Sequence, residues 1–224
     1  MSDARPSPAR AAARILLETR AVLMRPDEPF VLTSGRMSPV YVDCRRLISF
    51  PRARAALMDM AVDLLARDAG VEAFDAVAGG ETAGIAYAAW IADRLALPML
   101  YVRKQPKGFG RNAQIEGTFR DGDRVLLVED LATDGGSKLN FVHALRAAGA
   151  EVAHCLVVFH YGIFPQGIAA LTADGVALHA LATWHDVIDE AEASGYFAAD
   201  GLAEVRAFLA DPAAWSQAHG GEEM

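Results

Sequence analysis

The stretch VLLVEDLATDGGS, residues 125–137, decides the fold, because it passes from an apolar strand into a small polar loop without a break. Its first four residues are apolar and lead directly to Glu129 and Asp130. A short apolar run that ends in turn-forming residues is typical of a buried strand. Residues 136–148 are then predicted to form a helix, which Gly149 closes. The stretch therefore predicts a strand, a loop and a helix in succession, the repeating unit of parallel sheets.

The same alternation of apolar strands and helices recurs on both sides of this stretch. Nearly continuous apolar strands with helices between them are typical of a parallel sheet that is buried on both faces. We therefore expect an α/β fold with a mostly parallel central sheet and helices on both faces. The predicted strands are residues 74–80, 98–104, 124–130, 151–159 and 176–182, and the predicted helices are 51–69, 82–96, 136–148, 163–173 and parts of 185–210.

The N-terminal part of the chain has a different pattern. Residues 10–24 have apolar side chains near helical spacing and predict an amphipathic helix. Residues 29–46 are expected to be extended, with a turn at Ser34 and Gly35, since Pro39 disfavours a helix there. We find no internal repeat and no linker, so we expect a single domain over residues 1–224.

Composition and charge exclude several classes of protein. The chain has 224 residues, is 53% hydrophobic and 22% charged, and carries a net charge of −8. These values are ordinary for a globular protein, and no apolar run approaches the length of a membrane span. The acidic balance argues against general nucleic-acid binding. The distant cysteines Cys44 and Cys155 suggest neither a disulfide framework nor a zinc site, which fits a reducing cytoplasm.

The loop after the predicted strand 124–130 has the residues of a phosphate site. It lies before a helix, so its backbone N–H groups can converge on an anion, and Gly135 and Gly136 permit close approach. Glu129 and Asp130 would repel a phosphate, so we expect them to accept hydrogen bonds from hydroxyl groups of the same ligand. A ribose 5-phosphate supplies both groups. The alternative is a strand end with two solvated acids.

Two further segments carry possible chemistry. Residues 77–85, VAGGETAGI, place glycines between a strand and a helix, which suits either a second anion or tight packing of the helix on the strand. Residues 101–117, here called the basic segment, contain Arg103, Lys104, Lys107 and Arg111 among residues that break regular structure. This segment is either a solvated surface loop or a mobile lid whose cations neutralise a diphosphate leaving group.

These motifs resemble those of a known family. VLLVEDLATDGGS resembles the phosphoribosyl-diphosphate signature of type I phosphoribosyltransferases. The basic segment, with its R-K-x-x-K pattern at 103–107, resembles the catalytic loop of orotate phosphoribosyltransferases. Residues 30–51 and 157–165 also resemble this family, and the likeness runs over roughly residues 15–185.

The resemblance implies a fold, a reaction and a set of site residues. The fold would be type I phosphoribosyltransferase-like, with a small N-terminal hood at about 10–48, a core at about 50–185 and C-terminal helices at about 185–212. The reaction would join orotate to phosphoribosyl diphosphate in pyrimidine biosynthesis. It would need Mg²⁺, bound mostly through substrate oxygens without a firm protein ligand. The family also implies a homodimer with shared active sites.

The residues carried over by this resemblance fall into three groups. The catalytic residues would be Lys107, Arg103 and Asp130. Orotate would contact Thr133, Tyr41 and Arg45. Phosphoribosyl diphosphate would bind to Arg103, Lys104, Lys107, Glu129, Asp130, Leu131, Ala132, Thr133, Asp134, Gly135, Gly136, Ser137, Gly80 and Glu81.

Three positions depart from the family pattern, and two other functions compete. Asp134 stands where the family usually has a small hydroxyl or neutral residue, Phe109 replaces a histidine of the lid, and Thr33 replaces a lysine of some members. One alternative is a phosphoribosyltransferase for another base. The other is a regulator that binds phosphoribosyl diphosphate without turning it over, which the complete set of basic residues in the segment argues against.

Overall fold

The computed structural model describes residues 7–32, 34–107, 114–133, 136–163 and 165–222. Within it the chain forms two compact units. One unit comprises Met1–Phe50 together with Trp184–Met224, and the other comprises Pro51–Thr183. Each unit is described by itself below.

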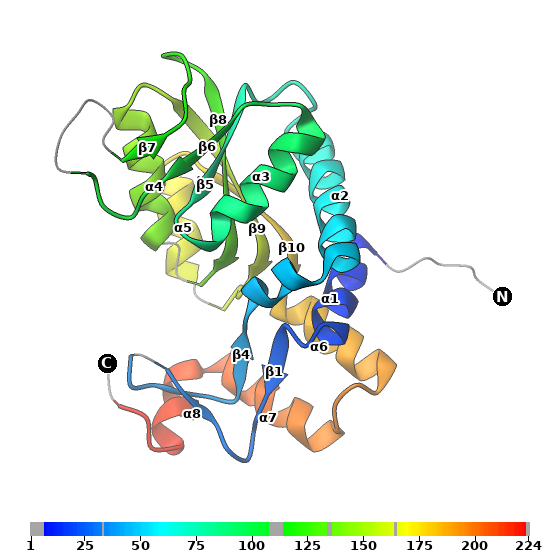
Figure 1. Ribbon diagram of the computed structural model, residues 1–224. Coiled ribbons are helices and arrows are strands. Elements are labelled where there is room, and N and C mark those ends of the chain that lie inside the picture. The colour runs from blue at the N-terminus through cyan, green and yellow to red at the C-terminus, as the bar shows by residue number, and fades with distance from the viewer. Residues whose placement is uncertain (1–6, 33, 108–113, 134–135, 164, 223–224) are drawn as a thin grey trace. The chain divides into compact units, whose positions relative to one another are not determined.

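The unit of residues 51–183 is built on a six-stranded sheet with the strand order β10-β9-β8-β5-β6-β7 (Figure 1). All neighbouring strands are parallel except β7, which pairs antiparallel with β6. The mostly parallel sheet expected from the alternating pattern is thus confirmed. The strands are β5 (Ala76–Gly80), β6 (Met99–Val102), β7 (Ile115–Glu116), β8 (Arg124–Ala132), β9 (Glu151–His160) and β10 (Ala177–Thr183).

Four helices cover this sheet. Helices α2 (Pro51–Asp68) and α3 (Ala83–Leu95) contact each other, as do α4 (Gly136–Ala147) and α5 (Pro165–Ala173) (Figure 1). The chain moves from β5 through α3 to β6 in one direction and from β8 through α4 to β9 in the other. Right-handed crossovers in opposite directions place α3 and α4 on opposite faces. The strand order therefore reverses between β5 and β8, and such a switch point is where open α/β sheets bind ligands.

The central strand β8 forms the middle of the hydrophobic core. Val125, Leu126, Leu127 and Val128 are all buried, as expected for a parallel strand covered on both faces. On one face β8 packs against apolar residues of α4 and β9. This packing brings the carboxyl end of β8 to the edge of the core, where the first polar residues of the loop begin.

The unit of residues 1–50 and 184–224 combines short strands with helices. Strand β1 (Val22–Met24) pairs antiparallel with β4 (Val40–Val42), and β2 (Phe30–Val31) pairs antiparallel with β3 (Met37–Ser38). A 3₁₀ helix, η1 (Cys44–Ser49), follows β4. The α-helices of this unit are α1 (Pro8–Glu18), α6 (Trp184–Ser194), α7 (Ala199–Ala210) and α8 (Pro212–Ala218).

Two expectations for the N-terminal segment are wrong in part. The helix predicted over residues 10–24 ends at Glu18, because Arg20 adopts a left-handed backbone conformation with φ of 54°. The following residues 22–24 form β1, since pairing with a strand distant in sequence overrides their near-helical spacing. The extended segment predicted over 29–46 holds through Val42, but residues 44–46 belong to η1.

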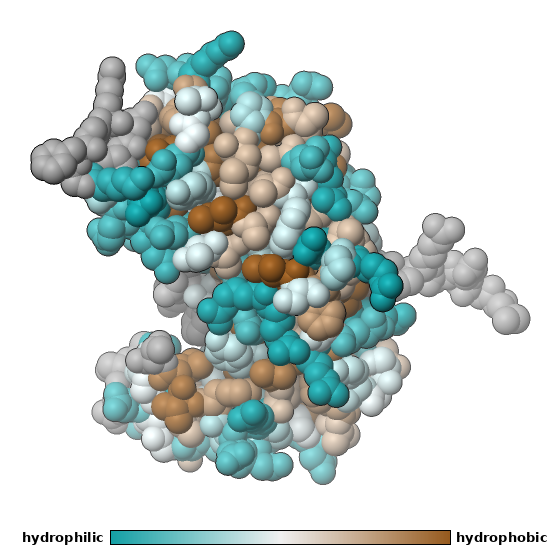
Figure 2. All heavy atoms as spheres, in the orientation of Figure 1, coloured by the Kyte–Doolittle hydropathy of each residue, from teal (hydrophilic) through white to brown (hydrophobic). Residues whose placement is uncertain are grey.

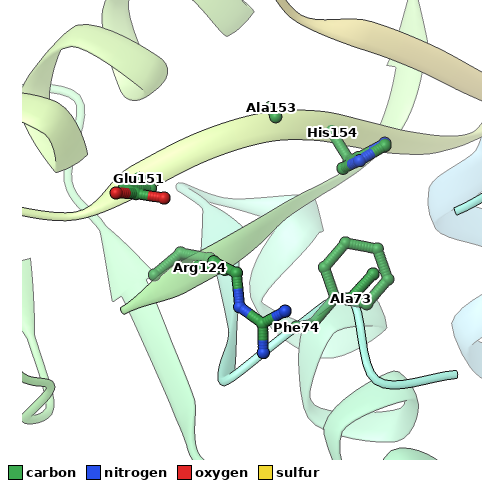
Figure 3. A pocket seen from close by; sticks show the side chains of 7 residues that line it. Ala73, Phe74, Arg124, Glu151, Ala153 and His154 are labelled. Atoms are coloured by element: carbon green, nitrogen blue, oxygen red, sulfur yellow. The ribbon is translucent and has the colours of Figure 1, made fainter. Parts of the chain in front are cut away.

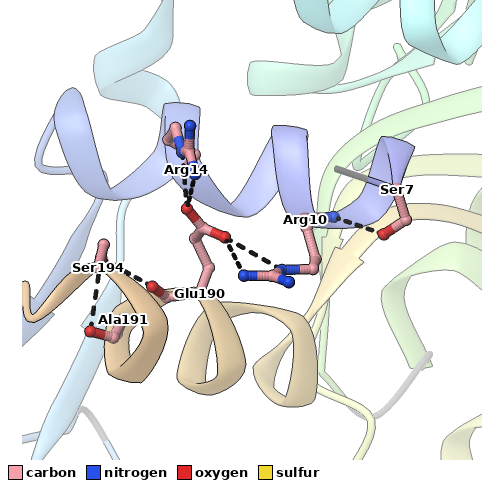
Figure 4. Close-up of polar contacts among 6 residues, drawn as sticks. All are labelled: Ser7, Arg10, Arg14, Glu190, Ala191 and Ser194. Atoms are coloured by element: carbon pink, nitrogen blue, oxygen red, sulfur yellow. Dashed lines mark hydrogen bonds and ion pairs between the residues drawn. The ribbon is translucent and has the colours of Figure 1, made fainter. Parts of the chain in front are cut away.

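Helices α1 and α6 are joined by a buried carboxylate. The side chain of Glu190 is 1% exposed and accepts hydrogen bonds from Arg10 Nε and Nη2 at 3.1 and 3.0 Å, and from Arg14 Nε at 2.6 Å (Figure 4). Burial opposes ionisation, but the bonds from Arg14 and Arg10 outweigh it and hold the pKa of Glu190 below its ordinary value. The charged network therefore fixes α1 against α6.

Hydrophilic side chains are spread over both units on the face drawn in Figure 2. Among the described residues, no helix is both long and apolar enough to cross a membrane. The large apolar side chains that are exposed are scattered along the sequence: Val31, Phe50, Val71, Ile168 and Tyr196.

Replacing Glu190 by glutamine should destabilise the protein by about 1 to 3 kcal/mol at neutral pH, because two arginines lose a charged acceptor. A carboxylate with a lowered pKa stabilises the fold above its ordinary pKa and loses that effect as the pH falls. The deficit should therefore shrink as the pH is lowered toward about 3. Urea unfolding at several pH values measures it.

Glu192→Gln is the matched control, because Glu192 lies on the same helix but forms an exposed ion pair with Arg206. Its loss should cost less than about 1 kcal/mol. Equal costs for the two substitutions would contradict a special role of the Glu190 network.

Candidate active site

The loop that follows β8 lies at the switch point of the sheet. Strand β8 ends at Ala132, Thr133 forms a bend, and α4 begins at Gly136. The Tyr161 N–H donates to the carbonyl oxygen of Ala132 at 2.9 Å, which ties the strand end to the segment after β9. The N-terminus of α4 thus lies at the carboxyl end of the sheet, the place where helix N-termini bind anions in such folds. Asp134 and Gly135 lie outside the described residues.

Glu129 is the buried member of the acid pair. It is 7% exposed, and its Oε2 lies 3.9 Å from Nζ of Lys138, which is itself buried. Its Oε1 is buried without a hydrogen-bond partner in the described structure. Burial raises the pKa of Glu129 to about 8, and the charge of Asp130 adds to this, while the cations of Lys138 and Lys104 oppose it. Glu129 is therefore poised to change its charge near neutral pH.

Glycines at the end of β5 and at the start of α3 make room for this carboxyl group. A Cβ atom added to Gly80 or Gly84 would collide with Oε1 of Glu129. A Cβ atom added to Gly79 would lie 2.6 Å from the carbonyl oxygen of Gly84 and 2.7 Å from Cα of Ile85. The sequence left tight packing and anion binding open for these glycines, and close packing of α3 and Glu129 on β5 is what the structure shows.

Asp130 and Thr133 are half-buried, in contrast to Glu129. Consecutive residues of a strand direct their side chains to opposite faces, so the two carboxylates leave β8 in different directions. The half-buried Leu131 and the buried Ala132 continue the strand, and Gly136 and Ser137 lie in the first turn of α4. The described residues of the predicted phosphate loop are thus brought to one edge of the sheet.

The basic segment is held at its base by the antiparallel pair β6 and β7. The N–H of Arg103 donates to the carbonyl oxygen of Gln114, and the side-chain amide of Gln114 donates back to the carbonyl oxygen of Arg103, both at 2.8 Å. The N–H of Lys104 donates to the Glu81 carboxylate at 2.8 Å. This bond connects the basic segment to the loop after β5. Phe109 and Arg111 lie outside the described residues, as does Thr33 of the N-terminal segment.

Glu116 is the counter-ion of two cations of the basic segment. Its Oε1 lies 2.6 Å from Lys107 Nζ and 3.6 Å from Nη1 of Arg103. The hydrogen bond and charge of Lys107 lower the pKa of Glu116, and Arg103 contributes less. Nε of Arg103 is buried without a hydrogen-bond partner in the described structure. Both cations predicted to act on the leaving group therefore already share a carboxylate.

The residues predicted to contact orotate belong to different units. Thr133 lies beside the phosphate loop, whereas Tyr41 and Arg45 belong to the unit that contains the N-terminal segment. There Arg45 donates to Tyr41 Oη at 3.2 Å and to Asp43 Oδ1 at 2.9 Å. Tyr41 also lies 5.6 Å, centroid to centroid, from the ring of Phe30. The assignment of these two residues to orotate stays a prediction.

A cavity lies at the amino end of β8 and β9, away from the loop that follows β8 (Figure 3). It is a cavity of about 140 Å³ lined by Phe74, Arg124, Glu151 and His154, among others. Arg124 donates to both carboxylate oxygens of Asp75 at 2.8 Å, and His154 Nδ1 lies 2.9 Å from Nε2 of His179. These polar groups already have partners. The cavity is also at the end of the sheet where parallel α/β folds rarely bind their ligands.

Two residues of the site were missed by the sequence analysis. Lys138 lies within the helix predicted after the loop, and a lysine in a helical stretch usually indicates a solvated surface. Glu116 follows the basic segment, and only the pairing of β7 with β6 brings it to Arg103 and Lys107. A possible signal was the scarcity of lysine, which occurs in the sequence only at positions 104, 107 and 138.

The comparisons with known proteins agree with this geometry. The phosphoribosyl transferase domain family matches residues 51–163, which include the loop after β5, the basic segment and the loop after β8. The fold and the matched residues define the class as phosphoribosyltransferase.

Comparison with individual proteins identifies the family within this class. The chain is 62% identical over 210 residues to the orotate phosphoribosyltransferase of Cereibacter sphaeroides, covering 94% of this chain and 90% of that protein. The solved structure of orotate phosphoribosyltransferase from Aeropyrum pernix is 35% identical with a TM-score of 0.70, covering 83% of this chain and 99% of that one. That of Mycobacterium tuberculosis in complex with phosphoribosyl diphosphate is 27% identical with a TM-score of 0.62, covering 80% and 98%. The chain therefore belongs to the orotate phosphoribosyltransferase family.

Replacing Glu129 by glutamine should stabilise the protein at alkaline pH. The folded state holds the proton of Glu129 up to a pKa of about 8, whereas an unfolded carboxyl releases it near 4.5. The wild-type protein therefore loses stability as the pH rises through this window, and glutamine, which is never charged, avoids the loss. We expect a gain of about 1 to 3 kcal/mol at pH ~9 and little change at pH ~5.

Urea unfolding at the two pH values measures this difference. Glu151→Gln, at an exposed position on β9, is the control and should show no pH-dependent gain. A Glu129→Gln protein that is less stable than wild type at alkaline pH would show that folding does not raise the pKa of this carboxyl group.

Proposed function

We propose that this chain transfers the 5-phosphoribosyl group of phosphoribosyl diphosphate to orotate, giving orotidine 5′-monophosphate and pyrophosphate in pyrimidine biosynthesis. One observation carries the proposal. The acid pair, the N-terminus of α4 and the glycines between residues 79 and 84 lie at the switch point of the sheet, and the chain is 62% identical, over 94% of its length, to an orotate phosphoribosyltransferase.

The ribose phosphate would be held by the loop after β8. Backbone N–H groups of residues 133–137 and the N-terminus of α4 bind the 5-phosphate, and Asp130 accepts hydrogen bonds from ribose hydroxyls. Breaking the bond between C1 and the diphosphate develops positive charge on the ribose ring. A carboxylate held near that ring stabilises the charge more in the transition state than in the bound substrate, which is how electrostatic catalysis works.

The diphosphate would be held by cations of the basic segment together with the loop of Gly80 and Glu81. Lys107, Arg103 and Lys104 neutralise the charge that appears on the leaving group. In the structure Lys107 and Arg103 face Glu116. We infer that the diphosphate takes over these two cations when it binds, since it carries more negative charge than one carboxylate.

Orotate would lie next to Thr133, with Tyr41 and Arg45 as candidates to contact its ring and carboxylate. A phosphoribosyltransferase for another base is the first competing function. A regulator that binds phosphoribosyl diphosphate without turnover is the second. The identity with orotate phosphoribosyltransferases over nearly the whole chain favours orotate, and the cations of the basic segment favour an enzyme.

Mg²⁺ is the proposed cofactor. Within the part of the chain that the structure describes, no three side chains of His, Cys, Asp or Glu are grouped to hold a metal ion. The ion would then depend on substrate oxygens and water, as Mg²⁺ often does in sites that bind phosphates. When bound, it would neutralise part of the diphosphate charge.

A homodimer with shared active sites is part of the proposal, as the family resemblance implies. The basic segment of one subunit would act in the site of its partner. We also propose that the enzyme works in the reducing cytoplasm, in keeping with its two buried cysteines, Cys44 and Cys155, which form no disulfide with each other.

The first test measures the ultraviolet loss of orotate with phosphoribosyl diphosphate and Mg²⁺, with pyrophosphate release as a second readout. Parallel reactions offer adenine, hypoxanthine, uracil and nicotinate. We expect turnover with orotate and none with the other bases. Turnover with another base would leave the phosphoribosyltransferase class but refute orotate as substrate. Binding of phosphoribosyl diphosphate without turnover of any base would favour the regulator.

Lys107→Ala should raise the barrier to turnover by about 2 to 4 kcal/mol, as expected for the loss of one preorganised electrostatic donor. Steady-state kinetics with orotate measure the change. Arg206→Ala, which removes an exposed cation on α7, is the control and should keep wild-type rates. A wild-type rate for Lys107→Ala would refute the role of the basic segment in leaving-group departure.

The same variant tests the shared site. Mixed with an Asp130→Asn chain, which we expect to be nearly inactive, Lys107→Ala should recover about a quarter of the wild-type rate, because half of the dimers are mixed and each has one intact site. No recovery after verified subunit exchange would place both residues of each site on one chain.

A further inference from the structure

Lys138 is buried in the first turns of α4, directly behind the phosphate loop. Its side chain is 7% exposed, although α4 begins only two residues earlier, at Gly136. Lysine is almost never buried unless it has an anionic partner, because taking its charge out of water is costly. The chain has only two other lysines, Lys104 and Lys107, and both are exposed. A buried lysine at this place therefore needs a reason.

The partner of Lys138 is Glu129, and the pair lies beneath two substrate loops at once. The side chain of Glu129 is 9% exposed, and its Oε2 lies 3.9 Å from Lys138 Nζ. Its Oε1 lies against the backbone of Gly80 and Gly84 and has no hydrogen-bond partner in the described structure. The carboxyl group thus has one oxygen toward α4 and one toward the end of β5 and the start of α3. A buried acceptor without a partner calls for an explanation, and a hydroxyl group of a bound ligand would supply the missing hydrogen bond.

We propose that Lys138 is a positioning residue for the reaction, which acts as the buried counter-ion of Glu129 and governs when that side chain is available to the ribose as a carboxylate. The proposal rests on the proposed function, because it assumes that Glu129 accepts a hydrogen bond from phosphoribosyl diphosphate. Lys138 acts through Glu129, whose carboxyl group lies 3.9 Å from its ammonium group.

The charges around Glu129 explain why Lys138 governs the ionisation of its carboxyl group. Burial opposes ionisation most strongly, and Lys138 is the strongest opposing influence, ahead of Lys104. The negative charge of Asp130, the next residue of β8, disfavours ionisation of Glu129. On β9, burial raises the pKa of the Cys155 thiol to about 12, while the charge of Lys138 lowers it and that of Glu129 raises it. The thiol therefore stays protonated in the pH range in which Glu129 titrates.

His160, at the end of β9, is the last of the titratable groups near Lys138 and Glu129. Burial lowers its pKa first, and the charge of Lys138 lowers it further, so this imidazole is neutral where Glu129 titrates. Removing Lys138 therefore leaves the ionised Glu129 buried beside Asp130 with only the exposed Lys104 to offset it. The ionisation of Glu129 must then move to higher pH.

The test compares the pH profile of kcat/KM for phosphoribosyl diphosphate in wild-type enzyme and in Lys138→Met, between about pH 6 and 10. Methionine has a similar length but no charge. We expect the acid limb to move up by at least about one pH unit, so that the variant is about tenfold slower at pH ~7 and approaches wild type at high pH. A loss by the same factor at every pH would overturn the proposal, because it would indicate a purely structural role.

Two companion variants sharpen the result. Lys138→Arg keeps the positive charge and should keep the acid limb near its wild-type position. Arg94→Met removes a half-buried cation that pairs with the exposed Asp59 on α2, and its acid limb should not move. A shift in Arg94→Met as large as that in Lys138→Met would also overturn the proposal, since net charge alone would then explain it.

A second measurement stays decisive if Lys138→Met does not fold. The acid limb of the wild-type enzyme should be absent from the profile of Glu129→Gln, which cannot titrate. Persistence of the limb in Glu129→Gln would refute the role of Glu129 and with it that of Lys138. A wild-type enzyme that turns over no orotate would instead refute the proposed function, so the two failures are distinguishable.

Discussion

The close approach of the end of β5 and the start of α3 to strand β8 is the constraint on which the site depends. Gly79 touches the backbone of α3, and Gly80 and Gly84 touch the carboxyl group of Glu129. A methyl group at any of these positions would push α3 or Glu129 away. The switch in strand order between β5 and β8 is what brings these glycines and this acid together. Backbone, helix termini and carboxylates can then converge on one ligand.

Charge in this protein is distributed in two ways. Exposed pairs such as Arg206 with Glu192 lie on the surface and contribute little to stability. Enclosed groups are few and are used at junctions: Glu190 joins α1 to α6, and Glu129 joins β8 to α4 and to the loop after β5. Burying a charge costs stability, so the second pattern is selected where position or protonation matters more than stability.

Much of the core could be predicted from the sequence, because strands buried on both faces are continuous apolar runs and the helices between them begin or end near proline and glycine. The loop after β8 was found for the same reason, since its polar residues follow such a run directly. Pairings between distant segments could not be predicted. Strand β1 depends on residues 40–42, and β7 is only two residues long. The ion pair of Lys138 and Glu129 was missed because it requires knowledge of the glycines that enclose it.

The distribution of lysine has a practical consequence for chemical labelling. Lysine occurs only at positions 104, 107 and 138, and each lies in or behind a loop of the candidate site. Lys107 is 58% exposed in its side chain, whereas that of Lys138 is 7% exposed. A reagent that acylates amines would therefore modify, apart from the chain terminus, the basic segment first and the buried lysine last. The order of amine modification therefore follows the exposure of these side chains.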